Sequence, residues 1–124
     1  MLELDAAKKT FLKPHALGGM LGQPYEESGC IKFLYQAFLL IGIPTTGNLL
    51  KDRHDWVRID GKPQYGDVAV FQHLAFTRYH VGLMLDWHWM IQSSDATNGV
   101  ARVDILREPW SMTLKGIWRH KECS

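Results

Sequence analysis

The chain has 124 residues, which is near the usual size of one domain, so we expect a single domain spanning residues 1–124. Basic residues number 14 and acidic residues 13, for a formal net charge of +1. Proteins that bind nucleic acid or an anionic membrane usually carry a basic stripe, and this sequence has none. Neither partner is therefore expected.

The N-terminal sequence lacks the apolar run of a signal peptide, and no stretch reaches the roughly 18 apolar residues of a membrane span. We therefore expect a soluble protein that is cytoplasmic as synthesised, and any role outside that compartment needs a separate delivery route. The two cysteines, Cys30 and Cys123, are too few for a disulfide framework. A bridge between them would tie a predicted helix start to a frayed tail, so we do not favour it.

The N-terminal half predicts helices. LELDAAKKTFL, residues 2–12, is typical of a short first helix. Apolar residues then recur every three or four positions from Cys30 to position 41, which predicts an amphipathic helix over three turns. Ser28 is its predicted N-cap, and Gly42 its predicted stop. Residues 45–56 are mostly polar and indicate at most a short helix.

The second half has the pattern of strands. Five short runs are rich in Val, Ile and aromatic residues, and turn-forming residues separate them. The runs are DVAVFQ (67–72), HVGLMLD (80–86), WMIQSS (89–94), VARVDIL (100–106) and LKGIWRH (114–120). Helices followed by strands predict an α+β domain, with N-terminal helices packed on an antiparallel sheet of about five strands.

Cys30 stands at the predicted start of a helix. The unpaired N–H groups of a helix N-terminus lower the pKa of a thiol and can also hold a developing oxyanion. Gly29, just before it, would let a substrate backbone approach closely. Cys30 also lies on the same apolar stripe as Phe33 and Phe38, and most buried cysteines are inert. Its position alone leaves both a nucleophile and a core residue open.

A nucleophilic cysteine needs a base, and the base needs a group that orients it. His80 begins one predicted strand, and Gln92 lies in the next. If the hairpin centres on Asp86, His80 and Gln92 are direct cross-strand neighbours. The Gln92 oxygen would then accept a hydrogen bond from Nδ1–H of His80, which leaves Nε2 to take the thiol proton. A purely structural His–Gln hydrogen bond is the alternative, and a cysteine at a helix start favours the catalytic interpretation.

The other histidines are weaker candidates for a site. The sequence has neither an H-E-x-x-H nor a C-x-x-C pattern, so the spacing predicts no zinc site, and it has no P-loop or dinucleotide-binding fingerprint, so we expect no metal and no cofactor. Trp87 and Trp89 flank His88 at a predicted turn. They suit a platform for a sugar or a peptide, but half-buried packing is the more usual role of tryptophans at a hairpin end.

Several of these segments together resemble the NlpC-type cell-wall peptidases, which are papain-like cysteine peptidases. The similarity runs from about residue 20 to residue 121, and its most specific part is the histidine strand. The segments are GQPY (22–25), GCIKFLYQAF (29–38), QYGDVAVFQ (64–72), HVGLML (80–85) and MIQSS (90–94). The ending LKGIWRHK (114–121) is similar to the last strand of phage-tail-associated members.

The resemblance implies a papain-like fold and hydrolysis of amide bonds in peptidoglycan stem peptides by Cys30, His80 and Gln92. Tyr25 and Gly29 would lie beside the substrate or the oxyanion, although Tyr25 also suits simple packing over the helix start. No metal or cofactor is implied. The expected partners are a peptidoglycan stem peptide and phage-tail or secretion-machine proteins, with delivery to the cell wall or incorporation in a virion or prophage tail.

Two features depart from the family pattern. Gly29 stands where the family usually has aspartate, and Ile31 and Lys32 follow the cysteine where a small or aromatic residue and a glycine are usual. The third site position is often histidine, whereas here it is Gln92. Two alternative functions therefore stay open: an acyltransferase on the same scaffold, and a non-catalytic structural module of a phage-tail or secretion complex.

Overall fold

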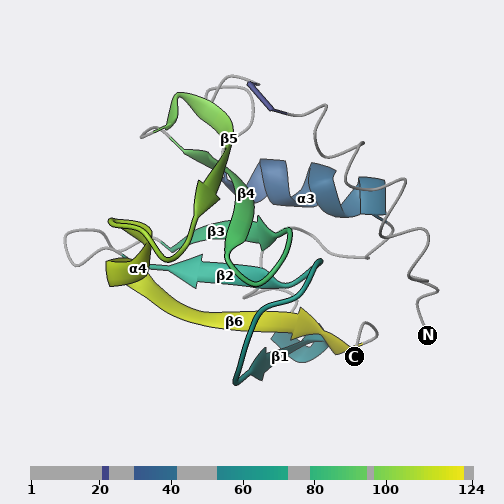
Figure 1. The fold of residues 1–124 in the computed structure, drawn as a ribbon. Helices are drawn as coiled ribbons and strands as arrows, with labels where there is room; N and C mark the ends of the chain where they lie inside the picture. Colours follow the sequence, from purple (N-terminus) through teal and green to yellow (C-terminus); the bar gives the residue numbers. More distant parts are fainter. Residues whose placement is uncertain (1–20, 23–29, 42–52, 73–78, 95–96, 122–124) are drawn as a thin grey trace.

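The structure is a computed structural model that describes residues 21–22, 30–41, 53–72, 79–94 and 97–121. In this part of the chain, helix α3 packs on an antiparallel sheet of six strands (Figure 1). A 3-10 turn, η2, precedes the first strand, and a one-turn helix, α4, precedes the last. The elements are α3 (Cys30–Ile41), η2 (Arg53–Asp55), β1 (Trp56–Ile59), β2 (Val68–Phe71), β3 (His80–Met84), β4 (Trp89–Ser94), β5 (Gly99–Asp104), α4 (Trp110–Thr113) and β6 (Leu114–His120).

The five predicted strands are confirmed as β2 to β6, but the prediction of about five strands is one short. Residues 56–59 form β1, which pairs with β6 at the edge of the sheet. The short helix expected over residues 45–56 is reduced to η2 in its described part, and Trp56 already belongs to β1. Trp56 is buried there, with its ring centroid 5.4 Å from that of Phe38 and 5.2 Å from that of His120.

The helix predicted from Cys30 is confirmed as α3. Its apolar stripe is buried, whereas Tyr35 and Leu39 on the other side are exposed. The first predicted helix (2–12), Ser28 and Gly42 lie outside the described residues, so the expected N-terminal helices are represented by α3 alone. No helix in the described part is both long enough and apolar enough to cross a membrane.

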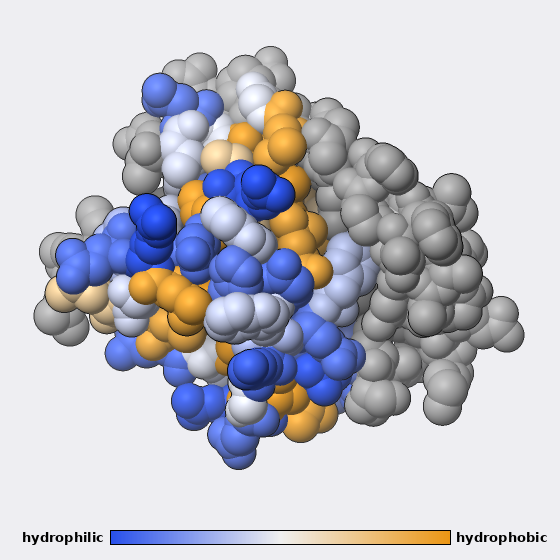
Figure 2. Space-filling view, in the orientation of Figure 1, coloured by the Kyte–Doolittle hydropathy of each residue, from blue (hydrophilic) through white to orange (hydrophobic). Residues whose placement is uncertain are grey.

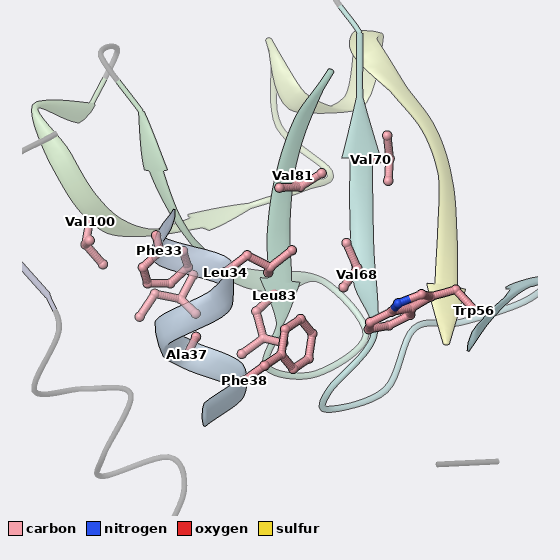
Figure 3. Close-up of a cluster of buried hydrophobic side chains, with 11 residues drawn as sticks. Phe33, Leu34, Ala37, Phe38, Trp56, Val68, Val70, Val81, Leu83 and Val100 are labelled. Carbon is pink, nitrogen blue, oxygen red and sulfur yellow. The ribbon is translucent and has the colours of Figure 1, made fainter. Parts of the chain in front are cut away.

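Buried hydrophobic residues lie on both faces of the sheet, and neighbouring residues of a strand belong to different clusters because successive side chains point in opposite directions. We call the face that contacts the helix the α3 face, and the opposite one the far face. The cluster between the helix and the α3 face combines helix residues Phe33, Leu34, Ala37 and Phe38 with sheet residues Val68, Val70, Val81 and Leu83 (Figure 3). The far face carries Ala69, Phe71, Met84, Met90, Ile105 and Ile117.

The outer surface mixes polar and apolar side chains. Figure 2 shows hydrophobic side chains in separate groups among hydrophilic ones. The exposed large hydrophobic residues come from several elements, including Leu39 of α3, Val57 of β1 and Met112 of α4. Scattered apolar residues of this kind are normal on a protein surface and by themselves mark no docking face.

An ion pair between the buried Asp67 and the partly exposed Arg119 joins β6 to the start of β2. The Asp67 side chain is only 1% exposed, and its two oxygens accept hydrogen bonds from Nε and Nη2 of Arg119, both at 2.8 Å. Asp67 Oδ2 also accepts the backbone N–H of Gln64 at 2.9 Å. The aspartate of the G-D pair therefore has a structural role, because it fixes the turn that leads into β2.

Replacing Asp67 by alanine should lower the free energy of unfolding by about 3 kcal/mol, because it removes two charge-assisted hydrogen bonds with Arg119 and leaves the backbone N–H of Gln64 without its acceptor. Urea denaturation measures this loss. The matched control is Asp55→Ala, which removes an exposed ion pair with Lys121 (3.2 Å) and should cost at most about 1 kcal/mol. Equal losses in the two variants would contradict a structural role for Asp67.

Candidate active site

His80 and Gln92 are in contact, as the sequence predicts. Nε2 of His80 lies 2.9 Å from Oε1 of Gln92, within hydrogen-bonding distance. His80 is the half-buried first residue of β3, and Gln92 is fully buried in β4. The imidazole of β3 is therefore held by the Gln92 amide of β4, which solvent does not reach.

The predicted register of this hairpin is wrong by two residues. Leu83 pairs with Ile91 and Met84 with Met90, so the hairpin centres on Trp87 rather than on Asp86. Gln92 therefore lies diagonally from His80 rather than directly opposite it. A shift of two residues keeps every side chain on its face of the sheet, so the contact still forms.

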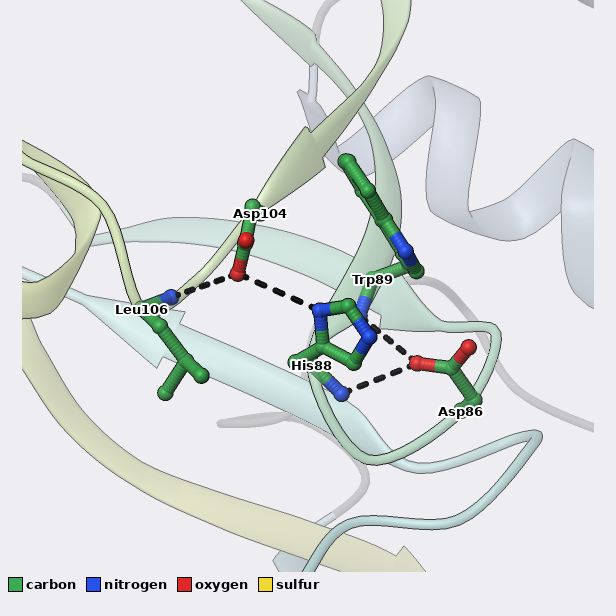
Figure 4. Close-up of polar contacts among 5 residues, drawn as sticks. All are labelled: Asp86, His88, Trp89, Asp104 and Leu106. Atoms are coloured by element: carbon green, nitrogen blue, oxygen red, sulfur yellow. Dashed lines mark hydrogen bonds and ion pairs between the residues drawn. The ribbon is translucent and has the colours of Figure 1, made fainter.

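The cause of the shift is the side chain of Asp86. Its Oδ1 accepts the backbone N–H groups of His88 at 2.9 Å and of Trp89 at 2.8 Å (Figure 4). The backbone N–H of Leu85 donates to the carbonyl of Trp89, so residues 86–88 form a three-residue loop. The carboxylate holds this loop in place of a tighter turn around Asp86.

The predicted role of the two imidazole nitrogens is also wrong. We expected Nδ1 of His80 to face Gln92, but Nε2 does so. Nδ1 is therefore the nitrogen that remains for a thiol. The ring packs against an aromatic pair, with centroids 6.2 Å from Phe71 and 5.5 Å from Trp110, and these two rings lie 5.5 Å from each other.

Gly82 provides the space that the Gln92 side chain needs. Continuing the register from Leu83 places Gly82 opposite Gln92. A β-carbon at position 82 would lie 2.5 Å from Sδ of Met90 and 3.2 Å from Cβ of Gln92. The glycine of H-V-G thus lets Gln92 lie diagonally toward His80, two residues away along β3.

Burial lowers the pKa of His80 below its usual value, and the hydrogen bond with Gln92 partly offsets this by raising it. At neutral pH the imidazole by itself therefore favours the uncharged form, which can accept a proton. Trp110 was not predicted as a neighbour of His80, because a residue in the connection after β5 shows no sequence pattern that links the two.

Cys30 begins α3 and is half-buried against the α3-face cluster. In Figure 3, Leu34, near the start of α3, points toward Val81, whereas Phe38, further along the helix, lies beside Leu83. Helix α3 and strand β3 therefore run in the same direction, so Cys30 and His80 begin their elements at the same end of the sheet. The imidazole rests on far-face residues, so the two side chains reach this end from opposite faces. Tyr25 and Gly29 lie outside the described residues.

The family model for NlpC/P60 matches residues 12–119. The chain belongs to the NlpC/P60 family. The earlier resemblance is thereby confirmed, whereas the association with phage tails stays a prediction. Members of this family are generally cell-wall peptidases, and usually cysteine peptidases or amidases.

Solved structures that share the fold include two NlpC/P60 family proteins. An NLP/P60 family protein from Staphylococcus aureus subsp. aureus Mu50, described as similar to a lipoprotein, is 18% identical over 96% of this chain and 43% of its own, with a TM-score of 0.75. An NlpC/P60 family protein from Bacillus cereus ATCC 10987 is 21% identical over 88% of this chain and 39% of its own, with a TM-score of 0.70. This chain thus spans less than half the length of either structure. No curated protein matches it.

Polar contacts of Asp86 and His88 stabilise the hairpin loop of this NlpC/P60 domain. Burial, the largest single effect, raises the pKa of Asp86, but hydrogen bonds from the backbone N–H groups of Trp89 and His88 and the nearby charge of Arg102 together bring it below its usual value. His88 Nδ1 lies 3.4 Å from Asp104 (Figure 4). Lys62 lies 5.0 Å from the ring centroid of the exposed Trp87.

Within the described ranges, no three His, Cys, Asp or Glu side chains are grouped to hold a metal.

Gly82→Ala should break the His80–Gln92 hydrogen bond in this NlpC/P60 domain. Crowding of a packed strand costs about 1–3 kcal/mol of stability, and the displaced Gln92 would no longer raise the pKa of His80. An NMR titration of His80 should therefore show a lower pKa. Gly116→Ala is the matched control, because its β-carbon would meet Trp118 and Arg58 instead. A His80 pKa that moves equally in both variants would show that crowding alone is responsible.

The free energy of unfolding should fall in weak acid because of His80. The folded-state pKa is below the unfolded value of about 6.5, so the unfolded chain binds the proton first. Stability from this group is complete above about pH 6.5 and is lost as the pH falls toward the folded pKa. His80→Gln should flatten this dependence in urea denaturation, whereas the exposed-site control His54→Gln should not. An unchanged slope in His80→Gln would refute the assignment.

Proposed function

We propose that this NlpC/P60 domain is a cysteine peptidase or amidase that hydrolyses amide bonds of peptidoglycan stem peptides. The observation that carries the proposal is the pairing of half-buried His80 with the buried amide of Gln92, at the end of the sheet where α3 begins with Cys30. A base with a fixed orientation beside a helix-start cysteine is the arrangement that nucleophilic thiol catalysis needs.

The proposed chemistry gives the two nitrogens of His80 different roles. Nδ1 of His80 takes the Cys30 proton, and the thiolate attacks the carbonyl carbon of the scissile amide. The backbone N–H groups at the start of α3 hold the oxyanion, and protonated His80 then gives its proton to the leaving amine. Water, deprotonated by His80, next hydrolyses the thioester and releases the new carboxylate. Gln92 holds the ring through Nε2 in every step.

His80 can serve a thiol that comes from the α3 face because it is the first residue of β3. A residue in the middle of a strand has backbone on both sides, and its side chain stays on one face of the sheet. At the first position the ring projects at the strand end, where no further residue of β3 separates the two faces. Phe71 and Trp110 contact the ring from the far face.

Gly29 and Tyr25 complete the proposed site. Gly29 directly precedes the nucleophile, where the lack of a side chain gives a substrate backbone room to approach. Tyr25 is proposed to line the same groove, with its hydroxyl toward the oxyanion. Delivery by a phage tail or a secretion machine accounts for access to a cell-wall substrate and belongs to the same proposal.

A non-catalytic structural module of a phage-tail or secretion complex is the second candidate. It is favoured by the packing of Cys30 against the apolar cluster on the α3 face, since a thiol in apolar surroundings is a poor nucleophile. The departures from the family pattern at Gly29, Ile31 and Lys32 point the same way.

The deciding measurement is the rate of alkylation of Cys30 by iodoacetamide as a function of pH, in a Cys123→Ser background. An activated thiol should react well below the roughly pH 8.5 of an ordinary cysteine, and His80→Ala should move the profile upward. His54→Ala controls for the loss of a histidine elsewhere. An ordinary profile that His80→Ala leaves unchanged would refute catalysis and favour the structural module.

Hydrolysis is then tested on peptidoglycan fragments. The wild type should release new amino and carboxyl termini from stem peptides, and Cys30→Ala should lower the rate by about a thousandfold or more. An added amine distinguishes the acyltransferase alternative, because a transferase would form a new amide where a hydrolase forms an acid. A Cys30→Ala variant as active as the wild type would exclude the thioester mechanism.

A further inference from the structure

Thr97, in the connection between β4 and β5, binds the other end of the Gln92 amide. Nε2 of Gln92 donates to Oγ1 of Thr97 at 3.1 Å. The same Thr97 oxygen lies 2.8 Å from the carbonyl of Gly99, 3.0 Å from the hydroxyl of Ser94 and 3.3 Å from the carbonyl of Ser94. Thr97 thus has no contact with His80 in this network except through Gln92.

The hydrogen-bonding capacity of the Thr97 hydroxyl determines the direction of these bonds. A hydroxyl has one proton to donate and two lone pairs that can accept. The carbonyl of Gly99 can only accept, and it is the nearest partner, so it takes the proton. The Thr97 oxygen then accepts one proton from Gln92 Nε2 and one from the Ser94 hydroxyl, which fills its capacity.

This arrangement favours one orientation of the Gln92 amide. Rotating the amide by half a turn would exchange its oxygen and nitrogen. Its oxygen would then face the Thr97 oxygen, and the Thr97 hydroxyl could donate to it only by giving up its bond to the carbonyl of Gly99, so the flipped amide would cost one hydrogen bond beside the fully buried Gln92 side chain. The oxygen of Gln92 therefore faces His80, and Nε2 of His80 must carry the proton that it accepts.

We propose that Thr97 is a positioning residue that selects the tautomer of His80 through Gln92. Three hydrogen bonds connect the Gly99 carbonyl to Thr97, Thr97 to Gln92, and Gln92 to Nε2 of His80. Because Nε2 carries the proton, Nδ1 of His80 keeps its lone pair. The use of that lone pair as a base rests on the proposed function. The assignment of the tautomer is independent of the proposed function, because the tautomer can be measured in a variant that lacks the Cys30 thiol.

Long-range proton–nitrogen NMR of the imidazole in 15N-labelled protein tests the proposal. Cys30→Ala serves as the background, since no thiolate then keeps the ring charged, and the pH is set above the pKa of His80. We expect the Nε2–H tautomer in this background. Adding Thr97→Val should shift the population toward Nδ1–H, because Gln92 is then no longer held in one orientation.

Two further variants separate the hydroxyl from the loop. Thr97→Ser keeps the oxygen and should restore the Nε2–H tautomer. Ser94→Ala removes a neighbour that touches Thr97 but not Gln92, and should also keep that tautomer. With Cys30 intact, Thr97→Val should lower kcat/KM by about tenfold, the effect of one neutral hydrogen bond, mainly through kcat, and Thr97→Ser should recover most of it.

Two results would overturn the proposal. A Cys30→Ala protein with the Nδ1–H tautomer would show that Gln92 faces the other way, and this result needs no change at Thr97. A folded Thr97→Val variant that keeps the Nε2–H tautomer would show that Thr97 does not select it. If the tautomer moves as expected but the intact protein cuts no peptidoglycan fragment, the role of Thr97 stands and the proposed function fails.

Discussion

The hydrogen-bonding requirement of one fully buried amide, that of Gln92, organises this end of the molecule. An unsatisfied buried polar group costs about 1–3 kcal/mol, so both ends of the amide need partners. His80 meets the oxygen and Thr97 the nitrogen. For the side chain to reach both, the residue facing it on β3 must lack a β-carbon, which is why Gly82 follows His80 by two positions. The histidine, the glycine, the glutamine and the threonine therefore form one structural unit.

The two proposed catalytic side chains come from different layers of this unit. Helix α3 packs on one face of the sheet, and the ring of His80 rests on the other face with Phe71 and Trp110. A thiol and an imidazole on opposite faces of a sheet can meet only where the strand between them ends. Both residues are the first of their elements, and the two elements start at the same end of the sheet (Figure 3). The parallel course of α3 and β3 is thus what makes the proposed chemistry geometrically accessible.

Periodicity predicted α3, the five strands β2 to β6 and the shared face of His80 and Gln92, because these depend on which side chains are buried. It missed β1, a four-residue edge strand in which Arg58 interrupts the apolar pattern. It misplaced the hairpin register, because the Asp86 carboxylate extends the loop to three residues. The predicted contact between His80 and Gln92 is still correct, because a register error of two residues leaves both side chains on the same face of the sheet. The wrong imidazole nitrogen and the unnoticed Thr97 have another cause: ring rotation and relay contacts depend on tertiary neighbours.

Gln92, as the group that orients His80, needs a second hydrogen-bonding partner that a carboxylate in the same position would not need. A carboxylate would accept from the imidazole with either oxygen and would favour its charged form. The amide of Gln92 offers one acceptor and one donor, so it orients the ring only if a second group determines which end faces His80. It also adds no charge, so burial prevails and the pKa of His80 stays low. Such a site keeps its base uncharged at neutral pH, but its geometry depends on the Thr97 hydroxyl, which lies one residue further from the reacting atoms.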